Sequence, residues 1–456
     1  MEEKLGNGFL YVTEYSEKFK RLIRKIADVS AKESLGKDLN GIGIFLFGSP
    51  SRQEMVDESD ADILIIRYKN SDDYRKFRKV FLENLKKEKF PKIDIPEWGS
   101  LEDCETYIKN CITEGNQVIE AKFLYGDINL AKDLSEMRNK YSTTEKFERI
   151  ICFQKFYFDQ YYKQRTLHGV KNVKYGHGGT RDLMFVTWFS NLMDLNENKR
   201  INFEDSFPHA HKSLSQLYSR GLINYNDYLE FLKQVEIVLI LRNQILIQNR
   251  GTKNEGITYL DEKSLETLFK RKIFNSDTIT TITNLEKYLK GALNGVAKLK
   301  NLVWELFLDY LKKNRGLNWY ERFINVLNGN ISYEILESIG PEDILTRMAV
   351  VWNLDKSSER ELFLRVFDEY SDSDNWEILS SICAHEECPT EILDKVAKKV
   401  CSLKGYEYIL RIIARNRNTK RSTLLYIINN PNLEERYRDI AELTLRKGLR
   451  RANEQR

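Results

Sequence analysis

The sequence predicts an α+β fold in which a small mixed sheet with helices comes first, an all-α helical domain follows, and an α-solenoid ends the chain. Two apolar runs, residues 42–47 and 63–66, are separated by turn residues and predict neighbouring strands. Much of the remaining chain has apolar residues at helical spacing, and its last third repeats with a period near 31 residues. We therefore expect domains at residues 1–135, 136–312 and 313–456.

Composition indicates a globular protein with no membrane partner. The 456 residues are 41% hydrophobic and 31% charged, and no run approaches the roughly 18 consecutive apolar residues of a membrane span. The first residues lack the pattern of a signal peptide, and the six cysteines include no Cys-x-x-Cys pair. We expect a cytoplasmic protein with reduced thiols, without disulfides or a zinc site.

Positive charge is concentrated near the end of the sequence. Residues 395–456 contain 16 Lys and Arg against 6 Asp and Glu, a net charge of +10, whereas the preceding residues carry −6. This asymmetry is typical either of contact with an acidic partner, such as nucleic acid, or of a charged helical surface with no partner.

Helices and a third strand are expected around the two apolar runs. Residues 14–34 and 72–88 have the spacing of amphipathic helices. Residues 90–98 read as a short strand with Asp94 at its centre, pointing away from the apolar face of its neighbours.

A glycine turn followed by two carboxylates lies between the first two strands. Gly48, Ser49 and Pro50 predict a helix start with Ser49 as its N-cap. Asp60 and Asp62 are two residues apart in a strand, so their side chains share a face, about 7 Å apart along the chain. A helix start can bind phosphate, and paired carboxylates can hold metal ions, so the stretch indicates metal-assisted phosphoryl chemistry.

This stretch resembles the signature of the DNA polymerase β-like nucleotidyltransferase superfamily, a Gly-Ser turn followed by Asp-x-Asp. That superfamily carries a third carboxylate on a neighbouring strand, where this sequence has Asp94. The resemblance implies that Asp60, Asp62 and Asp94 are catalytic and hold two Mg²⁺ ions, with Mn²⁺ as an alternative. It also implies that Asp94 can accept a proton.

Later motifs narrow the resemblance to the PII uridylyltransferase and glutamine synthetase adenylyltransferase group. Residues 119–127, at the end of an expected helical stretch over residues 100–127, are similar to a Leu-Glu-Ala-Arg…Gly-Asp helix of that group. Residues 174–182 match its Lys-x-Gly-x-Gly-Gly-x-Arg-Asp element. The resemblance covers roughly residues 41–268, with small departures such as Ser51 in place of a second glycine.

The resemblance implies a nucleotide site between the first two domains. The phosphates of an NTP, either ATP or UTP, would lie against the turn at Gly48, with Arg52 near the phosphates and Glu54 supporting the site. Lys174 and Arg181 would close over the nucleotide from the helical domain. The implied nucleotide-binding residues are Gly48, Ser49, Ser51, Arg52, Glu54, Lys174, Gly178, Gly179, Arg181 and Asp182, the last of which would orient Arg181.

The implied reaction moves AMP or UMP from the NTP to a hydroxyl of a protein acceptor and releases pyrophosphate. One alternative is transfer to RNA, such as a tRNA end, bound by the basic HEAT-like repeats. Others are synthesis of a nucleotide second messenger and a catalytically silent nucleotide-binding adaptor or antitoxin. Nothing after residue 268 resembles the phosphohydrolase or sensor domains of the uridylyltransferases, so their protein substrates are not carried over.

Overall fold

The chain forms two compact units, each assembled from separate segments of the sequence, in a computed structural model. Unit 1 contains Met1–Glu102, Gln117–Phe147 and Phe158–Leu308. Unit 2 contains Asp103–Asn116, Glu148–Tyr157 and Asp309–Arg456. The predicted α+β class is confirmed, whereas the three domain boundaries stay a prediction. The structure describes residues 7–53, 55, 60–68, 71–88, 93–96, 98–110, 113–165, 171–174, 179–197, 210–249, 259–274, 278–354, 360–403, 405–433 and 435–454.

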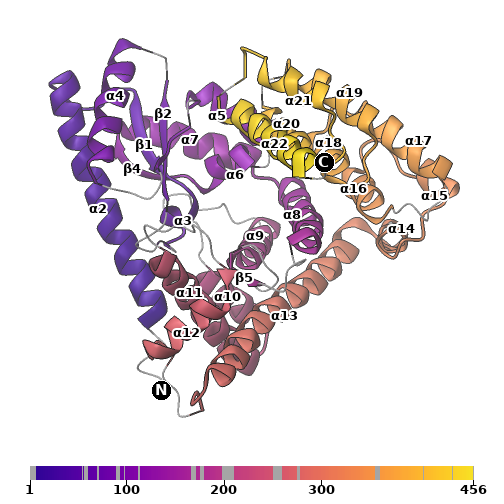
Figure 1. Cartoon of the computed structure of the whole chain (residues 1–456), viewed down its shortest axis with the longest axis horizontal. Helices are drawn as coiled ribbons and strands as arrows, with labels where there is room; N and C mark the ends of the chain where they lie inside the picture. Colours follow the sequence, from indigo (N-terminus) through magenta and orange to yellow (C-terminus); the bar gives the residue numbers. More distant parts are fainter. Residues whose placement is uncertain are drawn as a thin grey trace. The chain divides into compact units, whose positions relative to one another are not determined.

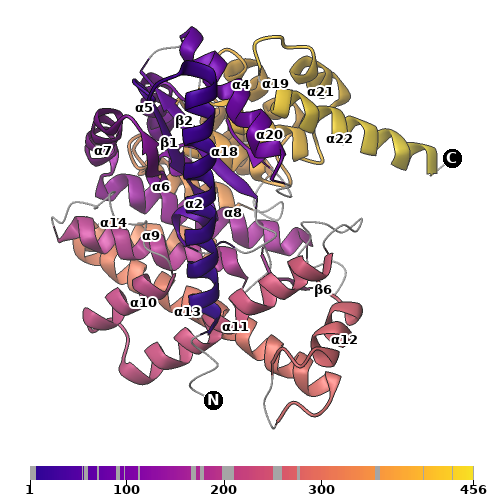
Figure 2. The ribbon, with the colours of Figure 1, turned by 90° about the vertical axis from the view of Figure 1, so that its left-hand side faces the viewer.

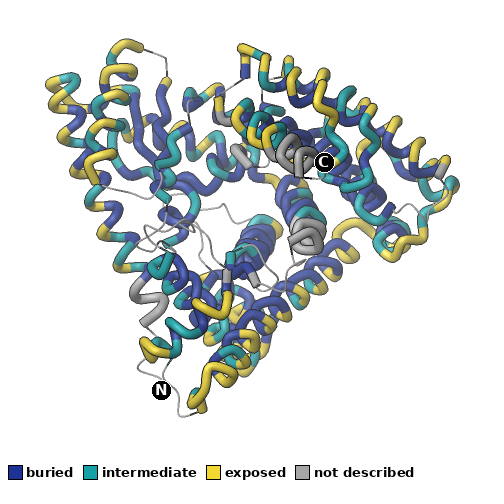
Figure 3. The backbone as a smooth tube through the Cα atoms, viewed as in Figure 1, coloured by how far each residue is buried: buried dark blue, intermediate teal, exposed yellow. Residues whose placement is uncertain are grey.

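Unit 1 is built around a four-stranded mixed sheet. β1 (Ile42–Leu46) pairs antiparallel with both β2 (Ala61–Arg67) and β4 (Lys122–Gly126). β3 (Ile93–Asp94) pairs parallel with β2, which gives the strand order β3-β2-β1-β4. β1 and β2 are almost completely buried, as their continuous apolar runs predict (Figure 3). The three strands expected near Asp94 and the glycine turn are therefore confirmed.

Two helices lie side by side over one face of this sheet (Figures 1 and 2). α2 (Asn7–Leu35) contributes Phe19 and other apolar residues to the core, and α4 (Asp72–Lys86) contributes Phe77. Both helices were expected from their periodicity. Burial of these apolar stripes, at about 25 cal/mol per Å², is the main force that holds the layers together.

The predicted helical stretch over residues 100–127 is partly wrong. The structure has two helices, α5 (Leu101–Asn110) and α6 (Thr113–Glu120), but the five residues that follow Ala121 form strand β4. The run Lys-Phe-Leu-Tyr-Gly is short and apolar, and such a run has no periodicity that separates a strand from a helix. Pairing with β1 decides its conformation.

The Gly126-Asp127 pair after β4 has a structural role. A Cβ on Gly126 would lie 2.3 Å from the carbonyl oxygen of Ile42, so only glycine allows this close approach to β1. The carboxylate of Asp127 accepts a hydrogen bond from the backbone N–H of Gly41 at 2.8 Å and caps the following helix, α7 (Ile128–Tyr141). The pair therefore fixes the start of β1.

The other described elements of unit 1 are helices, apart from one short antiparallel pair of strands from distant parts of the sequence. A buried ion pair joins two of these helices, because Lys300 Nζ lies 3.1 Å from the Asp182 carboxylate. None of the helices in the described ranges is long and apolar enough to span a membrane. The elements are α8 (Thr144–Arg165), β5 (Lys171–Asn172), α9 (Thr180–Asn196), α10 (Ala210–Ser219), α11 (Tyr225–Asn249), β6 (Tyr259–Leu260), α12 (Glu262–Lys270) and α13 (Ile282–Arg315).

Unit 2 contains pairs of helices that repeat along the chain. The first helices of two successive pairs begin at Trp376 and Glu407, and the second helices begin at Thr390 and Arg421, so the period is 31 residues. Alternate helices pack against each other in two layers, as in a solenoid. The helices are α14 (Leu317–Leu327), α15 (Tyr333–Glu337), α16 (Ile344–Asn353), α17 (Arg360–Ser371), α18 (Trp376–Ala384), α19 (Thr390–Val400), α20 (Glu407–Arg415), α21 (Arg421–Ile428) and α22 (Glu435–Glu454).

One layer of these repeats is covered by a segment of α8. The ring of Phe153 lies 5.9 Å from that of Trp376, and Phe156 lies 6.3 Å from Trp352. Arg149 also approaches the buried carboxylate of Glu377, at 3.6 Å. This face of α16 and α18 is therefore occupied by the chain itself.

Side-chain amides tie successive repeats together. Asn416 Nδ2 donates to the carbonyl oxygens of Cys383 at 2.9 Å and His385 at 2.8 Å. His385, 31 residues earlier, reaches back in the same way to the carbonyl oxygen of Leu354 at 3.0 Å. Equivalent positions therefore satisfy the exposed carbonyls at the ends of the preceding helices.

We predict that Asn416→Ala lowers the free energy of unfolding by about 1–3 kcal/mol, because two backbone carbonyls lose their donor. Urea denaturation followed by tryptophan fluorescence measures the change. Asn429→Ala, at the exposed end of α21, is the matched control and should have little effect. Equal effects of the two substitutions would contradict this role of Asn416.

Candidate active site

The glycine turn joins β1 directly to α3 (Gly48–Ser51). Gly48 has φ +63°, and a Cβ at this position would lie 2.5 Å from Asp62 Oδ2. The predicted N-cap is wrong: Phe47 occupies that position, because the left-handed turn at Gly48 already starts the helix and leaves Ser49 buried within it. Glycine is required here for both its conformation and the close approach of the Asp62 carboxylate.

Backbone hydrogen bonds fix this turn against β2. The N–H of Phe47 donates to the carbonyl oxygen of Asp62 at 3.2 Å, and the N–H of Arg52 donates to that of Gly48 at 3.2 Å. Ser51 Oγ also donates to the Gly48 carbonyl oxygen, at 2.9 Å. Ser51 is thus used inside the turn, and contact of Ser49 or Ser51 with a nucleotide stays a prediction.

Three carboxylates come from two neighbouring strands. Asp62 and Asp94 are opposite each other in the parallel pair β2–β3, and Asp60 immediately precedes β2. Burial, together with the negative charges of Asp94 and Asp60, raises the pKa of Asp62 to about 7, while the positive charges of Lys174 and Arg52 act in the opposite direction. The structure therefore brings these carboxylates within electrostatic reach of one another.

The donor chemistry of this cluster fits a hard divalent cation. Carboxylate oxygens are the ligands that Mg²⁺ prefers, and a cation would relieve the repulsion that raises the pKa of Asp62. Across the residues that the structure describes, no three carboxylate, imidazole or thiolate side chains converge into a finished metal site. Metal binding by Asp60, Asp62 and Asp94 thus stays a prediction.

Arg52 is held by a partner far along the sequence. Its Nη1 lies 2.5 Å from Glu120 Oε2, and both residues are buried. Glu120 ends α6 immediately before β4, so the pair joins the glycine turn to the far edge of the sheet. Glu120 was not expected to contact Arg52. Its position in the family-like motif at residues 119–127 was the one sequence feature that pointed to a role in the site. The expected position of Arg52 near phosphate stays a prediction.

Helix α2 supports the chain that follows the turn. The backbone N–H of Met55 donates to Ser16 Oγ at 3.2 Å, and Gln53, with φ +58°, donates from its side chain to Glu17 Oε1 at 3.3 Å. Ser16 and Glu17 were not expected in the site, because nothing local in the sequence marks helix residues that contact a loop almost 40 positions later.

The glycine-rich element is closed at its base and lies near the carboxylates. The N–H of Arg181 donates to the carbonyl oxygen of Lys174 at 3.0 Å, and Gly179 precedes the first residue of α9. Lys174 is close enough to lower the pKa of Asp62. Lys174 and the start of α9 thus join the site, whereas the expected residues Gly178 and Glu54 lie outside the described residues.

Asp182 has a different partner from the expected one. It is buried and paired with Lys300 of α13, so it anchors the first turn of α9 in the interior. Arg181 is partly exposed, with Nη1 3.1 Å from Met184 Sδ. Orientation of Arg181 by Asp182 stays a prediction.

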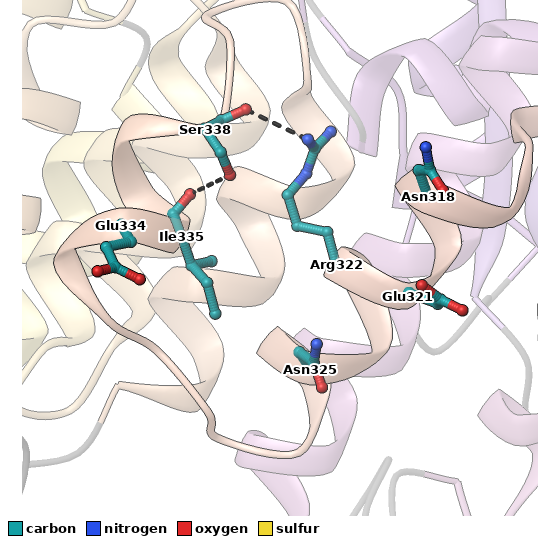
Figure 4. A pocket seen from close by; sticks show the side chains of 7 residues that line it. All are labelled: Asn318, Glu321, Arg322, Asn325, Glu334, Ile335 and Ser338. Atoms are coloured by element: carbon teal, nitrogen blue, oxygen red, sulfur yellow. Dashed lines mark hydrogen bonds between the residues drawn. The ribbon is translucent and has the colours of Figure 1, made fainter.

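A polar hollow in unit 2 lies between α14 and α15 (Figure 4). It has a volume of about 330 Å³, and Arg322 points across it to the carbonyl oxygen of Ser338 at 3.3 Å. Arg322 also donates to Asp343 at 3.2 Å, so its guanidinium already has acceptors. We assign no chemistry to this hollow.

Comparison with family models agrees with the geometry. A nucleotidyltransferase domain matches residues 29–119, the part that carries the glycine turn and the three carboxylates. This match supports the resemblance of the chain to the DNA polymerase β-like nucleotidyltransferase superfamily. A second model, GlnD PII-uridylyltransferase, matches residues 159–301 and places this nucleotidyltransferase near the uridylyltransferase group. A search of curated proteins finds no match.

We predict that Gly48→Ala lowers nucleotidyl transfer about 100-fold or more, because the new Cβ displaces Asp62. Transfer rate and Tm are measured together. Gly36→Ala is the matched control: its φ is also +63°, but an added Cβ meets nothing within 4 Å. It should cost about 1 kcal/mol of stability and little activity. Similar losses of activity in both variants would contradict a specific effect on Asp62.

We also predict a pH-dependent effect of Asp62→Asn in EDTA. The folded-state pKa of about 7 lies above the ordinary value of 3.8, so the free energy of unfolding falls as pH rises between them. Asn removes this fall, and the variant should have a Tm a few degrees above wild type at pH 8, with a smaller difference at pH 5. An Asp72→Asn control, at an exposed position, should show no such trend. An equal gain in Tm for Asp62→Asn at both pH values would refute the raised pKa of Asp62.

Proposed function

We propose that this nucleotidyltransferase moves an NMP, AMP or UMP, from an NTP to a hydroxyl of a protein acceptor in a Mg²⁺-dependent reaction. The observation that carries the proposal is the convergence of Asp60, Asp94 and Lys174 on Asp62 beside the Gly48 turn. The matching family models support NMP transfer in general. The metal, the base and the acceptor are the proposed part.

In this proposal Asp60, Asp62 and Asp94 hold the metal ions. When bound, Mg²⁺ would stabilise negative charge on the α-phosphate and lower the pKa of the attacking hydroxyl. Asp94, at the edge of the sheet, would accept the proton of that hydroxyl. Lys174, and Arg181, whose backbone N–H donates to the Lys174 carbonyl oxygen, would neutralise the phosphates. Arg52, fixed by Glu120, would keep the turn rigid.

A protein acceptor is favoured over RNA because some basic side chains of the repeats already pair with carboxylates. Lys420 pairs with Glu391 at 2.9 Å, and Arg417 approaches Glu386 at 3.8 Å, so part of the positive charge is balanced within the repeats. These pairs reduce the free basic surface on which RNA binding depends.

We predict that the purified protein labels a host protein from one of four α-³²P-NTPs in the presence of Mg²⁺. Label that survives RNase and disappears in Asp60→Ala/Asp62→Ala supports the proposal and identifies the base. The control Asp72→Ala removes an exposed carboxylate from the same unit and should keep full activity. RNase-sensitive label would show that the acceptor is RNA and not a protein. Absence of label with every NTP and lysate would favour a silent nucleotide-binding adaptor.

A further inference from the structure

A basic hollow lies in unit 1 between the end of β2 and one side of α4, the helix that packs beside α2 in Figure 2. Its volume is about 440 Å³, within the range of roughly 300–1,000 Å³ that is usual for small-molecule sites. One carboxylate, Glu83, lies among five cations. The cationic side chains that line the hollow are Arg67, Arg75, Arg78, Lys79 and Lys86.

Arg67 is the buried member of this set. It is only 8% exposed, and its guanidinium carbon lies 4.0 Å from the centroid of the Tyr74 ring. Its Nε and Nη1 are buried and have no hydrogen-bond partner among the described residues. Both nitrogens are closed off from solvent, so Arg67 contributes a buried positive charge to the wall of the hollow, and a bound anion would offset that charge.

The other cations come from one face of α4. Positions 75, 78, 79 and 86 follow helical spacing, which places their side chains along the same side of the helix. Arg75 pairs with Asp72, whereas no carboxylate in the described ranges pairs with Arg78, Lys79 or Lys86. The Nε of Arg78 is also buried without a partner there. The hollow therefore has an excess of positive charge with unused donors.

This hollow is distinct from the carboxylate site. Arg67 ends β2 and Asp62 lies near its start, so the two residues are separated by five positions, or about 17 Å along the strand. Five positions also place their side chains on opposite faces of the strand. A ligand in the hollow would thus not be the NTP that reacts at Asp62.

We propose that this hollow binds a small ligand with two or more phosphate groups. Guanidinium groups offer paired N–H donors that match phosphate oxygens, and several cations in one hollow favour a multiply charged anion. The ring of Tyr74 covers one face of the Arg67 guanidinium and holds its charge beside the cations of α4. The size of the hollow fits a small molecule better than an extended acidic peptide.

Isothermal titration with sodium tripolyphosphate in EDTA tests the proposal. Without divalent cations, the carboxylate cluster repels a polyanion, so binding under this condition reports the basic hollow. We expect wild type to bind and Arg78→Met/Lys79→Met to bind about tenfold more weakly, or worse, because two charge-assisted contacts are lost. This variant leaves the buried Arg67 untouched and should fold normally, as circular dichroism can verify.

Two charge-matched controls locate the binding. Lys76→Met removes an exposed charge from α4 outside the hollow, and Lys174→Met removes one beside Asp62, so both should bind like wild type. Equal binding by wild type and Arg78→Met/Lys79→Met, or loss of binding in Lys174→Met, would overturn the proposal. So would binding of a poly-glutamate peptide without binding of tripolyphosphate. If citrate bound more tightly than tripolyphosphate, the hollow would recognise carboxylate groups and not phosphate groups, which would also overturn the proposal. None of these results depends on nucleotidyl transfer.

Discussion

The close contact between Gly48 and Asp62 is the constraint on which the site depends. A carboxylate that is partly withdrawn from water, beside two others, is unfavourable unless its surroundings are fixed. The fold fixes them by backbone geometry: the left-handed glycine, the hydrogen bond from Phe47 to the Asp62 carbonyl, and the parallel pairing of Asp62 with Asp94. The helices α2 and α6 add side-chain supports from outside the sheet. Preorganised charge of this kind is what metal-assisted phosphoryl transfer requires.

The sequence was informative where the signal was local. The apolar runs of β1 and β2, the periodicity of α2 and α4, and the spacing of Asp60 and Asp62 each reflect the geometry of a single element. Where the conformation depends on a distant partner or on a backbone angle, the predictions were wrong. β4 was expected to be helical because a five-residue apolar run takes its conformation from its partner strand, and Ser49 was expected to be an N-cap because the φ of Gly48 is not visible in the sequence.

Contacts between distant segments could not be predicted in this way. Arg52 and Glu120 are 68 positions apart, and the buried partner of Asp182 is Lys300, in a different helix. Glu120 and Lys300 read as ordinary surface charges in their own helices. Their burial follows from how the helices pack, which no periodicity encodes. The same is true of Arg67, which reads as a strand terminus until its position over Tyr74 is known.

The discontinuous construction of unit 2 has a consequence for biosynthesis. Phe153 and Phe156 of α8 are made about 200 residues before Trp376 and Trp352, the aromatic residues that cover them. During translation these rings stay without their final neighbours until the repeats emerge from the ribosome. Exposed apolar surface of this kind favours aggregation and chaperone binding. Unit 2 therefore matures late, as a post-translational assembly of early and late segments, and a shortened chain that ends before the repeats would keep those rings uncovered.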